Sequence, residues 1–172
     1  MKVPLSLVLE TERFKLRAPK LADVPFIFSA TRHEGFNDGM PWGPPDSIDE
    51  LLPNVQKALD VWEANTAFSF TIVEKQEDDL IGRISIRSTK ETNRWNVGFF
   101  THPLQQKKGV MSEVLAEVVQ FGFTSLNAQV IEALYAIWNV GSERVLHKNG
   151  FKFVEFIEEG FRKNGIWVHE HK

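Results

Sequence analysis

The segment from His102 to Glu113 contains residue types that could bind a phosphate group. Gly109 stands where a strand-like stretch meets an amphipathic helical stretch, and Lys107 and Lys108 precede it. A helix N-terminus presents unpaired backbone N–H groups and the positive end of the helix dipole, and glycine allows close approach of the backbone to a ligand. A surface loop with solvated lysines explains the same pattern, and the residues alone favour that plainer interpretation. The phosphate-binding pattern Gly-x-x-x-x-Gly-Lys-(Ser/Thr) occurs nowhere in the chain.

A second segment, residues 139–151, begins with a polar residue at the start of another helical stretch. Asn139 is a favoured helix cap, and Ser142 falls in the first turn. Asn149 and Gly150 are typical of a helix end that needs a left-handed residue. Taken singly, these residues have ordinary structural roles.

Alternating helices and strands must position the two segments. Apolar and polar residues alternate over residues 14–17, which predicts a short strand. Three further strands are predicted over 68–72, 80–87 and 95–101, and together they form an antiparallel meander. Asp23 is expected to cap a first helix, and an apolar face predicts a helix over 110–123. Further strands are predicted over 130–137, 151–157 and 166–170. This order predicts one α/β domain over residues 1–172, with a mixed sheet and helices on both faces.

Composition excludes several function classes. The 172 residues include no cysteine, which excludes thiolate metal sites, disulfides and a thiol nucleophile. The net charge of −3 disfavours dedicated DNA binding, and no apolar run is long enough for a membrane span. The N-terminal stretch is not typical of a signal peptide, so we expect a cytoplasmic protein without nucleic-acid or membrane partners. His169 and His171 share one strand face without a third ligand, so we expect no metal.

Together the two segments resemble the GNAT superfamily of acyl-CoA-dependent N-acyltransferases, in its RimJ/RimL-like branch. The acyl-CoA loop of that family, (Gln/Arg)-x-x-Gly-x-(Gly/Ala), is matched by Gln106-x-x-Gly109-x-Met111. Its later motif is Asn-x-x-Ser-x-x-(Val/Leu)-Leu-x-Lys-x-Gly-Phe, and the matching residues are Asn139, Ser142, Val145, Leu146, Lys148, Gly150 and Phe151. Met111 is familiar in this branch where other relatives have Gly or Ala, and Lys107 replaces a common Gly. The resemblance extends from Leu9, in an opening strand typical of the branch, to Glu170.

The resemblance implies a single GNAT-like domain whose mostly antiparallel sheet has a central splay, with acyl-CoA lying in the gap. Backbone groups of Phe99, Phe100 and Thr101 would pair with the pantetheine arm, and Asn139 would reach it from the other side. The pyrophosphate would be held by backbone N–H groups of Gln106, Lys107, Lys108, Gly109, Val110 and Met111. Acetyl-CoA is thus the expected co-substrate, and no metal is expected.

The resemblance also implies direct attack of an amine on the thioester, with an N–H near Phe100 stabilising the oxyanion. Ser142 is expected to protonate the CoA thiolate, because Leu146 stands where many relatives have tyrosine and the single tyrosine, Tyr135, lies on the preceding strand. Some relatives place a glutamate where this chain has Asn96, so the base stays open among Glu34, His33, Glu132 and His102. The expected acceptor pocket is lined by Phe36, Trp42 and Trp138.

The leading hypothesis is an acetyl-CoA-dependent N-acetyltransferase that acts on a primary amine. The acceptor is either a protein N-terminus or a small amine such as a polyamine, amino acid or antibiotic. One alternative is a non-catalytic acyl-CoA-binding or partner-binding module on the same fold. A domain that binds another nucleotide is a third interpretation, which holds only if the Asn139 motif is a coincidence. A homodimer is also considered, with Trp62 as a candidate exposed contact.

Overall fold

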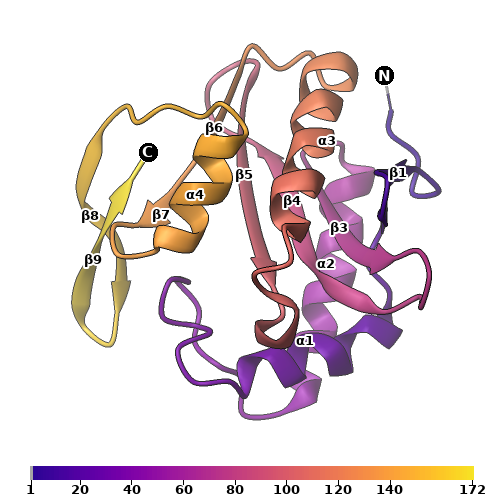
Figure 1. Ribbon diagram of the computed structural model, residues 1–172, viewed down its shortest axis with the longest axis horizontal. Coiled ribbons are helices and arrows are strands. Elements are labelled where there is room, and N and C mark those ends of the chain that lie inside the picture. The colour runs from indigo at the N-terminus through magenta and orange to yellow at the C-terminus, as the bar shows by residue number, and fades with distance from the viewer. Residues whose placement is uncertain (1) are drawn as a thin grey trace.

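The computed structural model describes residues 2–172 and contains two β-sheets (Figure 1). The larger sheet has six strands in the order β1-β2-β3-β4-β5-β6. They are β1 (Val8–Glu10), β2 (Phe14–Arg17), β3 (Ala67–Glu74), β4 (Leu80–Ser88), β5 (Arg94–Thr101) and β6 (Val130–Ala133). Neighbouring strands are antiparallel except β5 and β6, which run parallel. The predicted meander is confirmed as β3, β4 and β5.

The smaller sheet has three strands in the order β7-β9-β8. They are β7 (Tyr135–Ala136), β8 (Phe156–Lys163) and β9 (Ile166–His171). β5 pairs with β6 only from Arg94 opposite Val130 to Val97 opposite Ala133. After Ala133 the chain turns away from β5, and β7 pairs with β9 instead. The two sheets therefore part beside the last four residues of β5, and the expected splay is confirmed.

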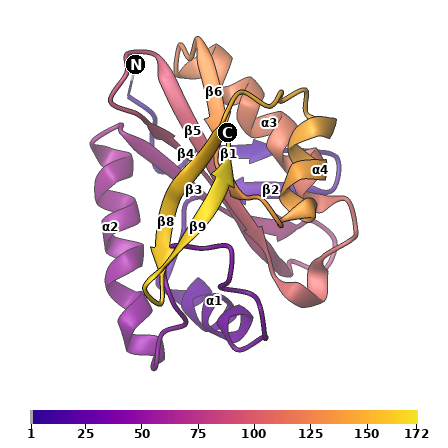
Figure 2. The same ribbon diagram turned by 90° about the vertical axis from the view of Figure 1, so that its left-hand side faces the viewer.

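Helices cover both faces of the larger sheet, as Figure 2 shows. α1 (Val24–Thr31) and α2 (Leu52–Glu63) lie on one side, and α3 (Val110–Ser125) and α4 (Val140–Lys148) lie on the other. Short 3-10 helices span Leu21–Asp23, Ile48–Leu51 and Pro103–Gln105. The smaller sheet stands apart beside α4, so a gap between the sheets faces the N-termini of α3 and α4 (Figure 1).

The apolar face predicted for residues 110–123 packs α3 onto the larger sheet. Val114, Leu115 and Val118 are fully buried against strand residues such as Ile84 and Ile86. Burial of each such side chain stabilises the fold by about 1.5–3 kcal/mol. This helix is held firmly, and its N-terminus is therefore fixed at the edge of the splay.

Trp62 is not an exposed dimer contact, and that expectation was wrong. Its side chain is 0 % exposed, and its indole Nε1 donates a hydrogen bond to the Val3 carbonyl at 3.2 Å. Its ring meets Phe68 and Phe70 edge-on at centroid distances of 5.3 and 4.9 Å. Buried tryptophan is a core residue here because its apolar area is covered and its one donor is satisfied.

Two other predicted elements differ in the structure. The single strand expected over residues 130–137 is interrupted at Leu134, because the chain changes sheet there. The strand expected over residues 151–157 begins only at Phe156 and continues to Lys163. It forms a hairpin with β9 through Asn164 and Gly165, which both have positive φ. Asn-Gly is a strong hairpin signal, and here it forms the turn between β8 and β9.

Candidate active site

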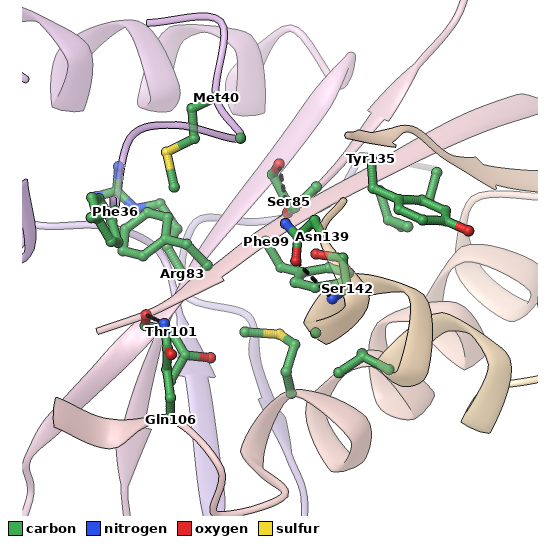
Figure 3. Close-up of a pocket in the computed structure, with 18 of the residues that line it drawn as sticks. Phe36, Met40, Arg83, Ser85, Phe99, Thr101, Gln106, Tyr135, Asn139 and Ser142 are labelled. Atoms are coloured by element: carbon green, nitrogen blue, oxygen red, sulfur yellow. Dashed lines mark hydrogen bonds between the residues drawn. The ribbon is translucent and has the colours of Figure 1, made fainter. Parts of the chain in front are cut away.

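The splay opens into a groove of about 1830 Å³. Its walls come from the end of β5, the turn before α3, the start of α4, the loop over residues 34–45, and the two hairpin strands β8 and β9. Figure 3 shows Asn139, Ser142 and Phe99 together in the middle of the site, with Gln106 and Thr101 on one side. All the residues that the sequence assigned to acyl-CoA, the acceptor and proton donation line this one groove.

The turn before α3 presents a set of free backbone donors. None of the N–H groups of residues 107–112 has an acceptor within the part of the chain that the structure describes. Gly109 has a φ of 73° and Lys107 a φ of 63°, so both residues are left-handed and curve the backbone around these donors. Arg13 holds the turn from outside, because it donates to the Lys108 carbonyl at 3.1 Å and pairs with Glu113 at 2.7 Å. Such a concave row of N–H groups can bind an anion.

The end of β5 offers a second set of backbone groups. Gly98, Phe99, Phe100 and Thr101 pair with β4 on one side, and β6 no longer accompanies them on the other. Phe99 packs on the main core, whereas Phe100 packs beside α1 and α2. An extended ligand with amide groups can satisfy such a half-free strand edge.

The start of α4 faces this strand edge across the groove. The Asn139 side-chain oxygen accepts the Ser142 backbone N–H at 3.1 Å, so the predicted cap is confirmed. This bond uses the oxygen of Asn139, and its Nδ2 group lies beside Gly39 on the groove wall, 3.4 Å from where a Cβ of residue 39 would stand. Ser142 lines the same wall and is half-buried. The helix end is also confirmed, since Gly150 has a φ of 80°.

Aromatic side chains form the opposite end of the groove. The Phe36 ring meets Phe100 edge-on at 5.3 Å and Trp42 at 6.4 Å. Trp138 lies so close to Gly39 that a Cβ there would be 3.4 Å from its ring. Lys163 fixes this loop from β8 by donating to the carbonyl groups of Asn37 and Met40. The three aromatic residues named from the sequence are therefore brought together.

The four candidate bases are not brought together. His102 is buried, its Nδ1 accepts the Leu104 N–H at 3.2 Å, and its Nε2 lies 3.1 Å from Ser29 Oγ. The rings of His33 and His102 meet edge to face, and neither histidine lines the groove. Glu132 forms ion pairs with Arg94 and Lys172 at 2.9 and 3.2 Å, outside the groove. Of the four, only Glu34 lies on the groove wall.

Several groove residues had not been named as site residues. Arg83, Ser85 and Arg87 alternate with Ile84 and Ile86 along β4, whose isoleucines are buried in the core, so the three polar side chains face the groove. Alternation of this kind is equally typical of a strand with one face in solvent, so the sequence pattern alone does not mark these three polar side chains as groove residues.

Glu170 on β9 also lines the groove, and burial raises the pKa of its carboxyl. The β8–β9 hairpin brings it there, opposite Ala136 of β7. Because the predicted boundaries of β8 were wrong, the sequence could not place this carboxylate.

Within residues 2–172, no helix combines the length and apolar character needed to cross a membrane. The same residues contain no cluster of three or more histidine or carboxylate side chains arranged to hold a metal ion.

The fold is therefore a mixed sheet that splays at β5, with free backbone N–H groups in the turn beside the splay. The chain matches the Acetyltransferase (GNAT) domain over residues 13–152, and it belongs to this family of acetyltransferases. It is 26% identical over 165 residues to the uncharacterized N-acetyltransferase YoaA of Bacillus subtilis, a match that covers 92% of this chain and 90% of YoaA.

Solved structures share the fold at lower identity. RimL, a ribosomal L7/L12 alpha-N-protein acetyltransferase in complex with coenzyme A, superposes with a TM-score of 0.86 at 16% identity, covering 96% of this chain and 95% of RimL. The spermidine N-acetyltransferase of Vibrio cholerae, in complex with CoA and spermine, superposes with a TM-score of 0.79 at 22% identity, covering 92% of both chains. The resemblance to the RimJ/RimL-like branch is thereby confirmed for the fold.

Proposed function

We propose that this acetyltransferase uses acetyl-CoA as co-substrate and transfers the acetyl group to a primary amine by direct attack in a ternary complex. The observation that carries the proposal is the pairing of two free backbone surfaces in one groove. The N–H groups of residues 107–112 and the open edge of residues 98–101 are adjacent along the chain and line the same space. A ligand with a pyrophosphate at one end and an extended amide arm at the other matches this order of surfaces.

The thioester carbonyl would lie beside the last residues of β5, where a backbone N–H near Phe100 stabilises the developing oxyanion. Ser142 would donate its hydroxyl proton to the departing CoA thiolate. A thiol with a pKa near ~8.5 is a good leaving group, so a weak hydroxyl donor suffices. The Asn139 Nδ2 group, which the helix cap leaves free, would bind the pantetheine arm from the opposite wall.

The amine must lose a proton before or during attack, and Glu170 is the groove carboxylate that we propose as the acceptor of this proton. It lines the groove, and burial raises the pKa of its carboxyl above the usual value. A raised pKa makes a carboxylate a stronger base toward an ammonium group. Among the described residues, Glu170 forms no ion pair that would compete for its charge.

Binding is tested by thermal unfolding with and without acetyl-CoA, with ATP as the control ligand. A ligand at ~100 times its Kd adds about 2.7 kcal/mol of stability, which moves Tm by a few degrees. A shift with acetyl-CoA and none with ATP is expected. Equal shifts with both ligands would favour a general nucleotide site, and no shift at millimolar acetyl-CoA would contradict the proposal.

Catalysis is tested with Ser142→Ala and release of free CoA thiol in the presence of an amine panel. The helix cap uses the Ser142 backbone N–H, so the variant keeps its fold. We expect turnover to fall about 100-fold while the Kd for acetyl-CoA is unchanged. A non-catalytic binding module would show no thiol release in the wild-type protein, and this outcome separates the two functions.

The fold by itself does not select the acceptor. The names of the two solved neighbours give a protein N-terminus for RimL and a polyamine for the Vibrio enzyme. Both classes of amine therefore belong in the acceptor panel.

A further inference from the structure

Arg83 is a half-buried arginine on the groove face of β4, and two of its guanidinium nitrogens have no hydrogen-bond partner among the described residues. These two atoms, Nε and Nη2, are both buried. The residue lies opposite Thr71 of β3 and Phe100 of β5, so it sits next to the strand end that carries the splay. The side chain lines the groove at the end where Phe36 and Met40 stand (Figure 3).

No carboxylate within residues 2–172 forms an ion pair or hydrogen bond with Arg83. Asp23 is the carboxylate whose charge acts on it, but both oxygens of Asp23 are already used. Oδ1 accepts from Arg17 at 2.7 Å, and Oδ2 accepts from Arg17, from the Lys20 N–H and from Thr71 at 2.8 to 2.9 Å. Burial lowers the pKa of the Arg83 guanidinium, and the neighbouring Arg17 lowers it further, although Asp23 acts in the other direction.

A buried charge without a counterion opposes folding, whereas an apolar side chain of the same size does not. An arginine at this position therefore weakens the free protein. Arginine is the side chain best shaped for two-point binding of a carboxylate. An anion bound in the groove would offset this cost further than Asp23 does, because Arg83 is one of the residues that line the groove.

Arg87 extends the same row of positive charge. Its Nη2 donates to Ser85 Oγ at 3.2 Å, and a Cβ on Gly98 would lie 2.9 Å from that nitrogen. The absence of a side chain at Gly98 thus lets Arg87 lie across β5 toward the splay. Neither arginine forms an ion pair within residues 2–172. Glu34, Glu50 and Glu170 are the carboxylates on the groove walls.

We propose that the acceptor amine carries a carboxylate and that Arg83 binds this carboxylate while the amine faces the thioester. The proposal rests on the proposed function, because it names the substrate class of the same groove. An α-amino or ω-amino acid and a peptide with an acidic side chain near its N-terminus share this chemistry. A polyamine, which carries only positive charge, is excluded as the preferred acceptor.

The test compares acceptors that differ only in the anionic group. For small molecules the pair is 4-aminobutyrate and 4-aminobutanamide, and for peptides it is Ala-Glu-amide and Ala-Gln-amide. kcat/KM is measured for each acceptor with wild-type protein, Arg83→Met and Lys57→Met. Lys57 is exposed on α2 outside the groove, so its replacement removes the same charge without touching the site. Comparing variants on the same pair cancels the intrinsic difference in amine reactivity.

The expected result is a carboxylate preference in at least one pair, which Arg83→Met reduces by about 10- to 100-fold and Lys57→Met leaves intact. The pair that shows the preference distinguishes a free amino acid from a peptide. The Kd for acetyl-CoA is unchanged, because Arg83 acts on the acceptor, and Tm of Arg83→Met is equal or higher. A wild-type protein without preference in either pair, or a preference that survives Arg83→Met, would overturn the proposal.

A binding measurement keeps this test separate from catalysis. Calorimetric titration of the CoA-bound protein with N-acetyl-Ala-Glu-amide, N-acetyl-Ala-Gln-amide and 4-acetamidobutyrate needs no turnover. Tighter binding of a carboxylate compound that is lost in Arg83→Met supports the proposal even if no amine in the panel is acetylated. Absence of thiol release with every amine would count against the proposed function, whereas equal binding of acid and amide would count against Arg83 alone.

Discussion

Asp23 and Arg17 form a two-point ion pair that joins the start of α1 to β2. The distances are 2.9 Å from Nη1 to Oδ2 and 2.7 Å from Nη2 to Oδ1, and Asp23 is 1 % exposed. Thr71 of β3 donates to the same carboxylate at 2.8 Å. Asp23 occupies the N-cap position of α1 as expected, but its carboxylate makes no side-chain cap bond to that helix. It instead fixes α1 and its 3-10 entry against two strands.

Replacing Asp23 with Asn is expected to destabilise the protein by about 3 kcal/mol, because Arg17 is left without its counter-charge in a largely buried position. Chemical denaturation of wild type and variant measures this difference. Asp78→Asn is the matched control: Asp78 also pairs with a cation, Lys15, but it is exposed on the surface. Its free energy of unfolding should change very little. Equal changes in the free energy of unfolding for the two substitutions would show that the buried Asp23–Arg17 pair stabilises the protein no more than the exposed Asp78–Lys15 pair.

The same carboxylate makes stability depend on pH. Burial alone would raise the pKa of Asp23, but hydrogen bonds from Arg17, the Lys20 N–H and Thr71 outweigh burial and hold the pKa below its ordinary value. A pKa lower in the folded than in the unfolded chain means that stability is present above the unfolded value and is lost as pH falls toward the folded value. As the pH is lowered from about 5, the free energy of unfolding of wild type should therefore approach that of Asp23→Asn, as measured by chemical denaturation at each pH.

Gly109→Ala should damage both the turn and acetyl-CoA binding. A φ of 73° is left-handed, and an alanine there costs about 1 kcal/mol or more. The turn relaxes, the N–H groups of residues 107–112 diverge, and the Kd for acetyl-CoA rises. Gly165→Ala serves as the control, because Gly165 also has a positive φ, 81°, but lies in the β8–β9 turn outside the groove, so only stability should fall. The pair is compared by Tm and by acetyl-CoA titration. Unchanged acetyl-CoA affinity in Gly109→Ala would argue against this turn as the pyrophosphate site.

Asn139 has two roles that two substitutions can separate. Asn139→Ala removes the bond to the Ser142 N–H and is expected to cost about 1 kcal/mol of stability. Asn139→Asp keeps an oxygen acceptor at a helix N-terminus, so stability is retained, but it lacks the Nδ2 donor. Both variants should bind acetyl-CoA more weakly than wild type, whereas only Asn139→Ala should unfold more easily. If Asn139→Asp bound acetyl-CoA as tightly as wild type, the residue would act as a helix cap alone.

The sequence was most informative where local rules decide the structure. The helical period placed α3, the preference of Asn for a helix start placed α4, and alternation placed β3, β4 and β5. These signals depend on nearest neighbours, so tertiary structure did not override them. The two motifs, Gln106 to Met111 and Asn139 to Phe151, therefore fall on the expected elements, and their residues share one groove.

Groups positioned by long-range packing could not be predicted in this way. Asp23 was assigned by proximity to a helix, yet its partner Thr71 lies 48 residues away in the chain. Arg83 and Glu170 enter the groove because β4 faces it and because the C-terminal hairpin folds back beside β7. Neither the pairing of β9 with β7 nor the change of sheet at Leu134 has a local signature, so the charged side chains of the groove emerged only from the structure, whereas its aromatic residues were predicted.

Glu170→Gln tests the proposed proton acceptor through a pH profile. A base works in its deprotonated form, so wild-type kcat/KM should rise with pH through the pKa of Glu170, which burial raises. The variant is expected to lose about 100-fold in kcat/KM and to lose this acidic limb. A pKa that is higher in the folded state than in the unfolded state also means that stability falls as pH rises from the unfolded value toward the folded one. At neutral pH the variant should therefore be as stable as wild type or more stable.

Glu34→Gln is the control for Glu170→Gln, because Glu34 is a groove carboxylate on the flanking loop. It should change the acceptor KM more than the shape of the profile. Gly160→Ala offers a second approach: its Cβ would lie 2.5 Å from Cγ of Glu170 and 2.8 Å from the Val168 carbonyl oxygen, so both the carboxylate and the β9 backbone that carries it must move. That variant keeps the charge but displaces it, and kcat should fall with the acidic limb still present. A profile that is identical in wild type and Glu170→Gln would contradict the proposal, since it would show that no step depends on this carboxylate.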